Sequence, residues 1–163
     1  MITEKMQNAF LSQINKELFS EYLYLSMKAY FAQLNLKGFV NWMSIQVQEE
    51  HAHGMGMFDY VIERGGKIEL GAIEKPKCSW ESPLEVFKDV VNHEQYITSQ
   101  INEVYDVADS EKDRAAQLFL NWYVKEEVEE EASAGDILAH LELIKDDTKA
   151  LLDLDKELST RVF

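Results

Sequence analysis

The sequence has few of the residues that interrupt or cross-link a chain. Its 163 residues include seven glycines, two prolines and one cysteine, Cys78. A single cysteine excludes an intrachain disulfide and a cysteine-rich metal site. Both prolines lie between residues 76 and 83. Because little else punctuates the chain, a helix-rich fold is expected.

Long apolar runs and an excess of positive charge are also absent. No apolar stretch approaches the roughly 20 residues of a membrane-spanning helix, and the N-terminus Met1–Lys5 lacks the apolar core of a signal peptide. With 30 acidic and 16 basic residues the net charge is −14, which argues against nucleic acid and anionic membrane as partners. We therefore expect a cytoplasmic protein, whose acidity reflects either a solvated surface or the handling of cations.

Helical periodicity runs through nearly the whole sequence. Apolar residues recur at helical spacing in four long segments and one short one, which predicts helices over residues 4–34, 38–64, 83–108, 111–143 and 148–158. Thr3 is placed to cap the first helix, and Ser82-Pro83 with Glu85 forms a capping box at the third. The connection at 67–82 fits a crossover within one bundle better than a linker between two domains. We expect one all-α domain, 1–163: a four-helix bundle with a long crossover and a short fifth helix.

Each of the four long helices carries acid on its apolar face. Glu50 and His53 form the clearest local pattern, because residues three apart project from the same side of a helix and can reach one metal ion. The other helices carry Glu17, Glu94, and Glu127 with Glu130. His51 points about 100° away from the Glu50 face, so we expect it at the surface.

The acidic residues also fall at similar depths. At about 1.5 Å per residue, Glu17 lies about 26 Å before the first tight turn and Glu50 about 20 Å after it. Glu94 lies about 22 Å before the second turn and Glu127 about 25 Å after it. One such glutamate is usually a boundary residue that reaches solvent, but several carboxylates together in a core must share protons or bind cations. Carboxylates with one imidazole suit Fe(II) or Mn(II), and four or more can hold two ions.

Over essentially its full length the chain resembles the bacterial non-haem ferritins, whose di-iron bundle also projects glutamates inward from four helices. The segments that carry the resemblance are 17–24 (ELFSEYLY), 48–53 (QEEHAH), 121–131 (NWYVKEEVEEE) and 154–159 (LDKELS). It implies a ferroxidase that oxidises Fe(II) with dioxygen or hydrogen peroxide. It also implies storage of Fe(III) as a hydrated oxide mineral inside a homo-oligomeric 24-subunit shell. No haem is expected, because no methionine lies between Glu50 and His53.

The resemblance also implies roles for individual residues. Glu17, Glu50 and His53 hold a first iron, and Glu50 bridges to a second. Glu94 and Glu130 hold that second iron with Glu127 close by, and which of the last two is the resting ligand stays open. A third, weaker iron site uses Glu49, Glu126, Glu129 and Glu130. Tyr24 matches the family's tyrosine beside the centre, as either a core or a redox residue.

Two departures and three related architectures bear on this interpretation. Glu127 stands where many ferritins have glutamine, and Glu130 stands where bacterioferritins have the histidine of a second Glu-x-x-His motif. A rubrerythrin-like oxidase or peroxidase needs paired Cys-x-x-Cys motifs, which one cysteine cannot form. A light-chain-type subunit that only nucleates mineral is disfavoured by the retained ligand set. A DNA-protecting mini-ferritin lacks a fifth helix.

Overall fold

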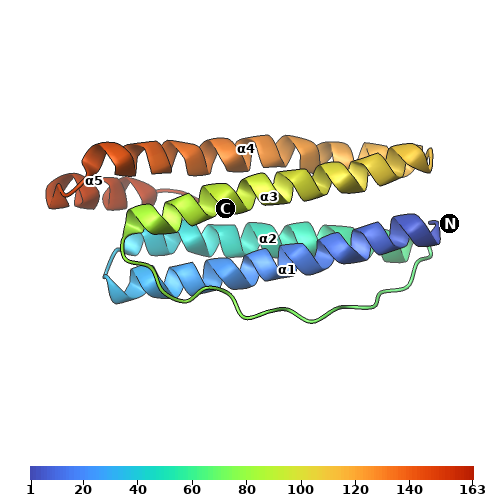
Figure 1. The fold of residues 1–163 in the computed structure, drawn as a ribbon, viewed down its shortest axis with the longest axis horizontal. Helices are drawn as coiled ribbons and strands as arrows, with labels where there is room; N and C mark the ends of the chain where they lie inside the picture. Colours follow the sequence, from blue (N-terminus) through green and yellow to red (C-terminus); the bar gives the residue numbers. More distant parts are fainter.

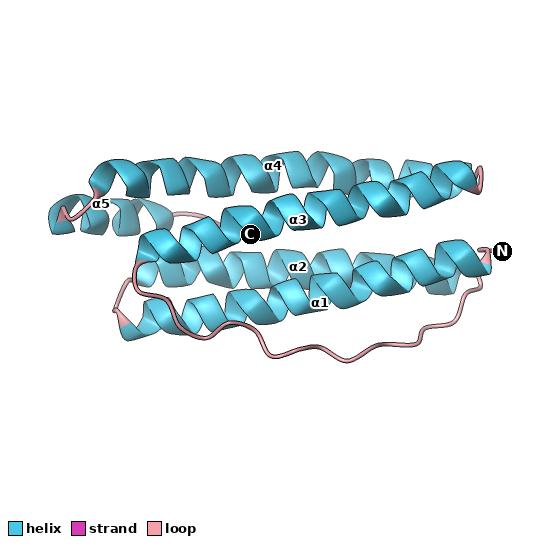
Figure 2. Cartoon of the chain, in the orientation of Figure 1, coloured by secondary structure: helices cyan, strands magenta, loops and turns pink.

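The computed structural model describes residues 1–163 as five α-helices without strands (Figure 2). The helices are α1 (Glu4–Gln33), α2 (Lys37–Glu63), α3 (Pro83–Ser110), α4 (Arg114–Ile144) and α5 (Thr148–Leu158). The first four lie side by side as two antiparallel hairpins, α1 with α2 and α3 with α4, and α5 lies at one end (Figure 1). The expected all-α bundle with a short fifth helix is confirmed. None of the helices combines the length and apolarity that a bilayer crossing requires.

The junction between α3 and α4 differs from the expected one. The sequence suggested that the third helix ends at Ala108 and the fourth begins at Glu111, but α3 continues through Ser110 and α4 begins at Arg114. Asp113 caps α4, because its Oδ1 accepts a hydrogen bond of 3.1 Å from Ala116 N. Arg64 at the end of α2 holds the same carboxylate at 2.9 Å, so a tertiary contact favours this cap.

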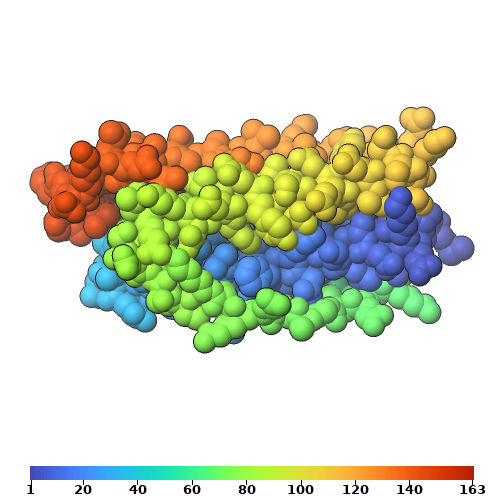
Figure 3. Space-filling model, in the orientation of Figure 1, coloured from blue at the N-terminus to red at the C-terminus, as the bar shows by residue number.

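The crossover between α2 and α3 runs along the outside of α1 for most of the bundle's length (Figures 1 and 3). Three α1 side chains bind its backbone. Gln7 Oε1 accepts from Lys67 N at 2.9 Å, Asn15 Nδ2 donates to the Ala72 carbonyl at 2.9 Å, and Ser26 Oγ donates to the Lys77 carbonyl at 2.7 Å. The crossover delivers the chain to Ser82, whose hydroxyl caps α3 by accepting from Glu85 N.

The hydrophobic core consists of two clusters with a polar layer between them. One cluster gathers around Phe31, Phe39 and Phe87, and the other around Phe10 and Ile101. Between them every long helix presents buried polar side chains: Gln13, Glu17 and Ser20 on α1, Gln46, Glu50 and His53 on α2, Glu94 on α3, and Glu127 and Glu130 on α4. The apolar clusters hold the four helices in register, and so bring the layer together.

The short helix α5 docks on the beginning of α2. No side chain of α2 itself caps that helix, and Asp155 of α5 does so instead. Its Oδ1 accepts from Gly38 N at 2.8 Å and from Phe39 N at 3.0 Å. Gly38 permits this approach, since a Cβ at that position would lie 1.5 Å from the Asp155 carbonyl oxygen.

We therefore expect Gly38→Ala to push α5 away from α2 and to lower stability by about 1–3 kcal/mol, the usual cost of overpacking. Gly135→Ala in α4 is the matched control, because nothing lies within 4 Å of the added Cβ. There the lost flexibility of the unfolded chain should raise stability by about 0.4–1 kcal/mol. Thermal unfolding followed by circular dichroism compares the two. Equal effects from both substitutions would contradict the proposed contact.

Candidate metal centre

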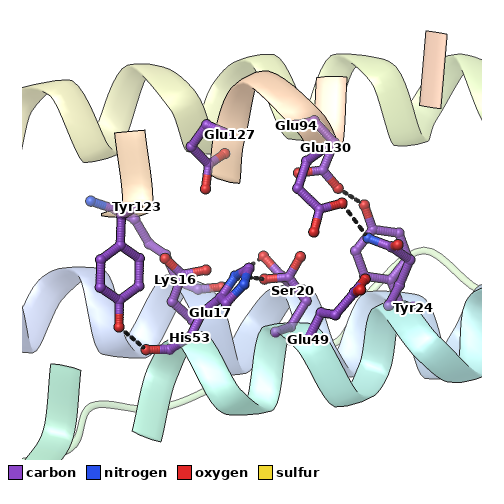
Figure 4. Close-up of polar contacts among 12 residues, drawn as sticks. Lys16, Glu17, Ser20, Tyr24, Glu49, His53, Glu94, Tyr123, Glu127 and Glu130 are labelled. Atoms are coloured by element: carbon purple, nitrogen blue, oxygen red, sulfur yellow. Dashed lines mark hydrogen bonds and ion pairs between the residues drawn. The ribbon is translucent and has the colours of Figure 1, made fainter. Parts of the chain in front are cut away.

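Six side chains of the kind that bind metal lie within the polar layer. Their exposed fractions are 0% for Glu17, 1% for Glu50, 3% for His53, 1% for Glu94, 2% for Glu127 and 5% for Glu130. Figure 4 shows the carboxylates of α3 and α4 directed toward the residues of α1 and α2. The structure thus places in one buried layer all six residues that the sequence suggested for the di-iron centre.

Glu17, Glu50 and His53 make the tightest group. One ligand atom from each lies within 4.8 Å of the others, and His53 Nδ1 is 3.8 Å from Glu50 Oε2. Gln13 Nε2 donates to Glu17 Oε1 at 2.8 Å, which leaves Glu17 Oε2 without a hydrogen-bond partner. Glu50 Oε2 is also buried and unpartnered. Buried polar atoms are rarely left unsatisfied, so the donor set fits a cation that binds both oxygens.

A second group consists of His53, Glu126 and Glu130, whose ligand atoms also approach within 4.8 Å. His53 therefore belongs to both groups. Glu126 is half-buried, and Glu130 Oε2 accepts from Gln46 Nε2 at 2.7 Å. The two groups together form a continuous set of donors across α1, α2 and α4, large enough for more than one divalent ion.

Glu94 and Glu127 lie in the layer but outside both groups. The hydroxyl of Tyr24 donates to Glu94 Oε1, and this short contact turns the carboxylate toward α1 (Figure 4). Thr98 Oγ1 lies 3.4 Å from Glu127 Oε2 and donates more closely, at 2.6 Å, to Glu131. Each of the two carboxylates thus faces a neighbouring hydroxyl.

The residues suggested for a third iron site do not form one group. Glu49 Oε2 accepts from Arg161 Nη2 at 2.7 Å, and Glu129 is exposed. Glu126 and Glu130 are the two that approach each other. His51, as expected, is exposed, and its Nδ1 lies 3.1 Å from Glu21 Oε2 on the surface of α1.

Several residues that support the centre escaped the sequence reasoning. Gln13 and Gln46 each precede a buried glutamate by four residues, so their position on the same helical face was a readable signal. Spacing predicts that Tyr123 faces inward but not its contact with α2, where its hydroxyl donates at 2.9 Å to the backbone carbonyl of His53. Gly54 lets α1 approach α2, since an added Cβ would lie 3.3 Å from the Glu17 Cβ.

Comparison with known proteins decides the family. A family described as "Ferritin-like domain" matches residues 7–144. The chain belongs to the ferritin family. Similar relatives include the bacterial non-heme ferritin of Bacteroides fragilis (strain 638R), which is 41% identical over 161 residues and covers 99% of this chain and 100% of its own. The corresponding protein of Staphylococcus aureus (strain MRSA252) is 37% identical over 163 residues, 100% and 98% of the two chains.

Solved structures of ferritins resemble this one closely. The Archaeoglobus fulgidus ferritin engineered into a closed form superposes with a TM-score of 0.98 at 55% identity, covering 100% of this chain and 99% of that one. The open-pore ferritin of the same archaeon gives 0.97 at 55% identity, with coverage of 99% and 98%. The suggested resemblance to the bacterial non-haem ferritins is confirmed.

Burial sets the protonation of the centre in this ferritin. It raises the pKa of Glu127 to about 9 and that of Glu130 to about 7, and neighbouring carboxylates add to both shifts. Glu50 and Glu94 have a pKa well above the usual range for the same two reasons. Burial lowers the pKa of His53 to about 4. A neutral imidazole is ready to bind metal, whereas the protonated carboxyls must release protons as a cation enters.

These shifts predict that the metal-free protein loses stability as pH rises. The folded state binds a proton at Glu127 more tightly than the unfolded chain does. The contribution of Glu127 to stability is therefore fully present below about pH 4.5 and is lost as the pH rises through about 9. We expect the unfolding temperature of stripped protein to fall between about pH 6 and about pH 9. Glu127→Gln should flatten that decline, and the exposed Glu129→Gln should not. An equal effect of both variants would contradict the assignment.

Proposed function

We propose that this chain stores and detoxifies iron: it oxidises Fe(II) at the buried centre and keeps Fe(III) as a hydrated ferric oxide inside a 24-subunit shell. The observation that carries the proposal is the pair of buried, unpartnered oxygens, Glu17 Oε2 and Glu50 Oε2, beside the imidazole of His53. Two such acceptors are satisfied either by a proton shared between the carboxyls or by a cation that binds both, and the neutral imidazole of His53 beside them is the ligand expected for a metal ion. The relatives that bear the name of non-heme ferritins support iron as that cation.

The residue roles follow the resemblance to the ferritins, and the group of Glu17, Glu50 and His53 supports the first of them. We assign Glu17, Glu50 and His53 to a first iron, with Glu50 bridging to a second. Glu94 and Glu130 would hold the second iron, with Glu127 close by. The resemblance further assigns a third, weaker place to Glu49, Glu126, Glu129 and Glu130, of which Glu126 and Glu130 approach each other. To bind that iron, the carboxylates of Glu94 and Glu127 would have to leave the neighbouring hydroxyls of Tyr24 and Thr98.

The chemistry of oxidation suits this donor set. Anionic oxygens stabilise Fe(III) more than Fe(II), because the attraction grows with the charge of the ion. Two Fe(II) ions held together supply two electrons at once. Dioxygen takes these two electrons with two protons and leaves as hydrogen peroxide, or hydrogen peroxide takes them with two protons and leaves as two waters. The carboxyls that release protons on metal binding lie beside this reaction.

Tyr24 orients the second half of the centre. Its ring is fully buried, and its hydroxyl holds Glu94 on the side of α1. The phenol is therefore both a packing residue and a group that can be oxidised next to the irons. No haem-binding methionine lies between Glu50 and His53, so iron and its oxidant are the proposed partners and haem is not.

Assembly into a shell is proposed on the basis of exposed apolar side chains. Leu118 and Val128 on α4 are 73% and 68% exposed, and Leu143 near its end is 80% exposed. These side chains are available to contacts between copies of the chain, and the family to which the chain belongs supports a shell. The net charge of −14 disfavours nucleic acid and membrane as partners. Free Cys78 suits the reducing cytoplasm, which is the proposed compartment.

The double substitution Glu50→Ala with His53→Ala should slow aerobic Fe(II) oxidation by more than about 100-fold, since even outer-shell partners of a metal cost about 10–100-fold. Stopped-flow absorbance of ferric species measures the rate. The matched control is Glu21→Ala with His51→Ala, which removes the surface glutamate–histidine pair. It should oxidise iron normally. A normal rate in the Glu50 and His53 variant would show that oxidation happens elsewhere.

Light scattering coupled to size-exclusion chromatography tests the assembly. A shell of 24 chains of 18.9 kDa is expected, and both double variants should retain it because none of their residues lies in the exposed apolar set. A monomer, dimer or dodecamer would contradict the proposed shell.

A further inference from the structure

A basic side chain from the C-terminal tail lies against the edge of the acidic centre. After α5 ends at Leu158, the tail turns back along α2. Asn41 Nδ2 holds it by donating to the carbonyls of Leu158 at 3.1 Å and Arg161 at 3.0 Å. Together with the Asp155 cap, these bonds attach the end of the chain to α2 at two points. They place the guanidinium of Arg161 beside Gln46 and Glu49, about one to two helical turns beyond Asn41 along α2.

The guanidinium of Arg161 makes three contacts on one face of α2. Nη1 donates to Gln46 Oε1 at 2.5 Å, and Nη2 donates to Glu49 Oε2 at 2.7 Å. The central carbon lies 4.9 Å from the centre of the Trp42 ring. Residues 42, 46 and 49 are spaced by four and three, so they lie on one side of the helix. A planar fork that also stacks on an aromatic ring is specific to arginine.

Gln46 transmits this contact into the buried layer. Because its side-chain oxygen accepts from Arg161, its amide nitrogen is free to donate to Glu130 Oε2, at 2.7 Å. Glu130 belongs to the second group of ligand atoms, with His53 and Glu126. The single charge of Arg161 therefore acts on Glu49 directly and on Glu130 through one side chain.

We propose that Arg161 is a tethered cation that competes with metal ions for Glu49. The guanidinium neutralises Glu49 until a divalent ion displaces it, and the tail then leaves the Trp42 ring. The inference rests on the proposed function, because it assumes that these glutamates receive Fe(II). Arg161 is thus a positioning residue: it decides when Glu49 becomes available to metal.

The exposure of the pair supports displacement. The side chains of Arg161 and Glu49 are 23% and 20% exposed, so both can regain water when they separate. Partly exposed ion pairs contribute little to stability. A divalent ion brings twice the charge of the guanidinium, and the charges of Glu126 and Glu130 lie close enough to act on Glu49 or be acted on by it. Because of this competition, metal ions bind next to Glu49 last, after they have bound to the buried group of Glu17, Glu50 and His53.

Zn(II) titration of the metal-free, assembled protein by calorimetry tests this order. Arg161→Gln should tighten the weakest class of Zn(II) sites by about two- to fivefold, the scale of one lost competing ion pair. Arg161→Lys keeps the charge but loses the planar fork and the ring stacking, so its Zn(II) binding should fall between that of the native protein and that of Arg161→Gln. The matched control is Lys149→Gln, which removes an exposed charge of α5 that pairs with Asp153, and its Zn(II) binding should be unchanged.

A double-mutant cycle shows whether the effect runs through Glu49. In a Glu49→Gln background, Arg161→Gln should have no further effect on the weakest sites. Unchanged or weakened binding at those sites in Arg161→Gln, with the tight buried sites intact, would overturn this inference alone. Absence of the tight sites from the native protein would overturn the proposed function, and this inference with it.

Discussion

The structure depends on the cost of keeping several carboxylates in one buried layer. Glu17, Glu50 and Glu94 are each at most 1% exposed, and their charges lie far from water. Like charges in such an environment repel strongly, so the folded chain carries protons there or binds cations. The two apolar clusters on either side provide the stability that tolerates this layer. The polar layer that separates the two clusters is thus also the candidate metal site.

Local patterns in the sequence predicted the features that depend on short spacing. Periodicity indicated the helical bundle, and residue counts from the turns placed Glu17, Glu50, Glu94 and Glu127 at one level, where the structure has them. These inferences need only the helical rise and the antiparallel arrangement of neighbouring helices. They do not depend on the detailed packing.

Contacts between distant parts of the chain were not predictable in this way. Ser110 and Asp113 can both cap a helix, and the pairing of Asp113 with Arg64 from another helix favours the second. The direction of a side chain cannot be predicted from spacing either. Spacing places Glu94 on the correct face of its helix, but the hydroxyl of Tyr24 determines where its carboxylate points. The position of Arg161 depends on how α5 docks, 112 residues away from Glu49 in the sequence.

The docking of α5 also has a consequence for the order of folding. The first turn of α2 receives its cap from Asp155, which is 117 residues further along the chain. During synthesis the first hairpin therefore emerges with the N-terminus of its second helix uncapped, and it stays so until Asp155 has been made. Contacts of such long sequence separation form late, because the intervening loop must close first. A segment made long after the first hairpin is thus the one that completes it.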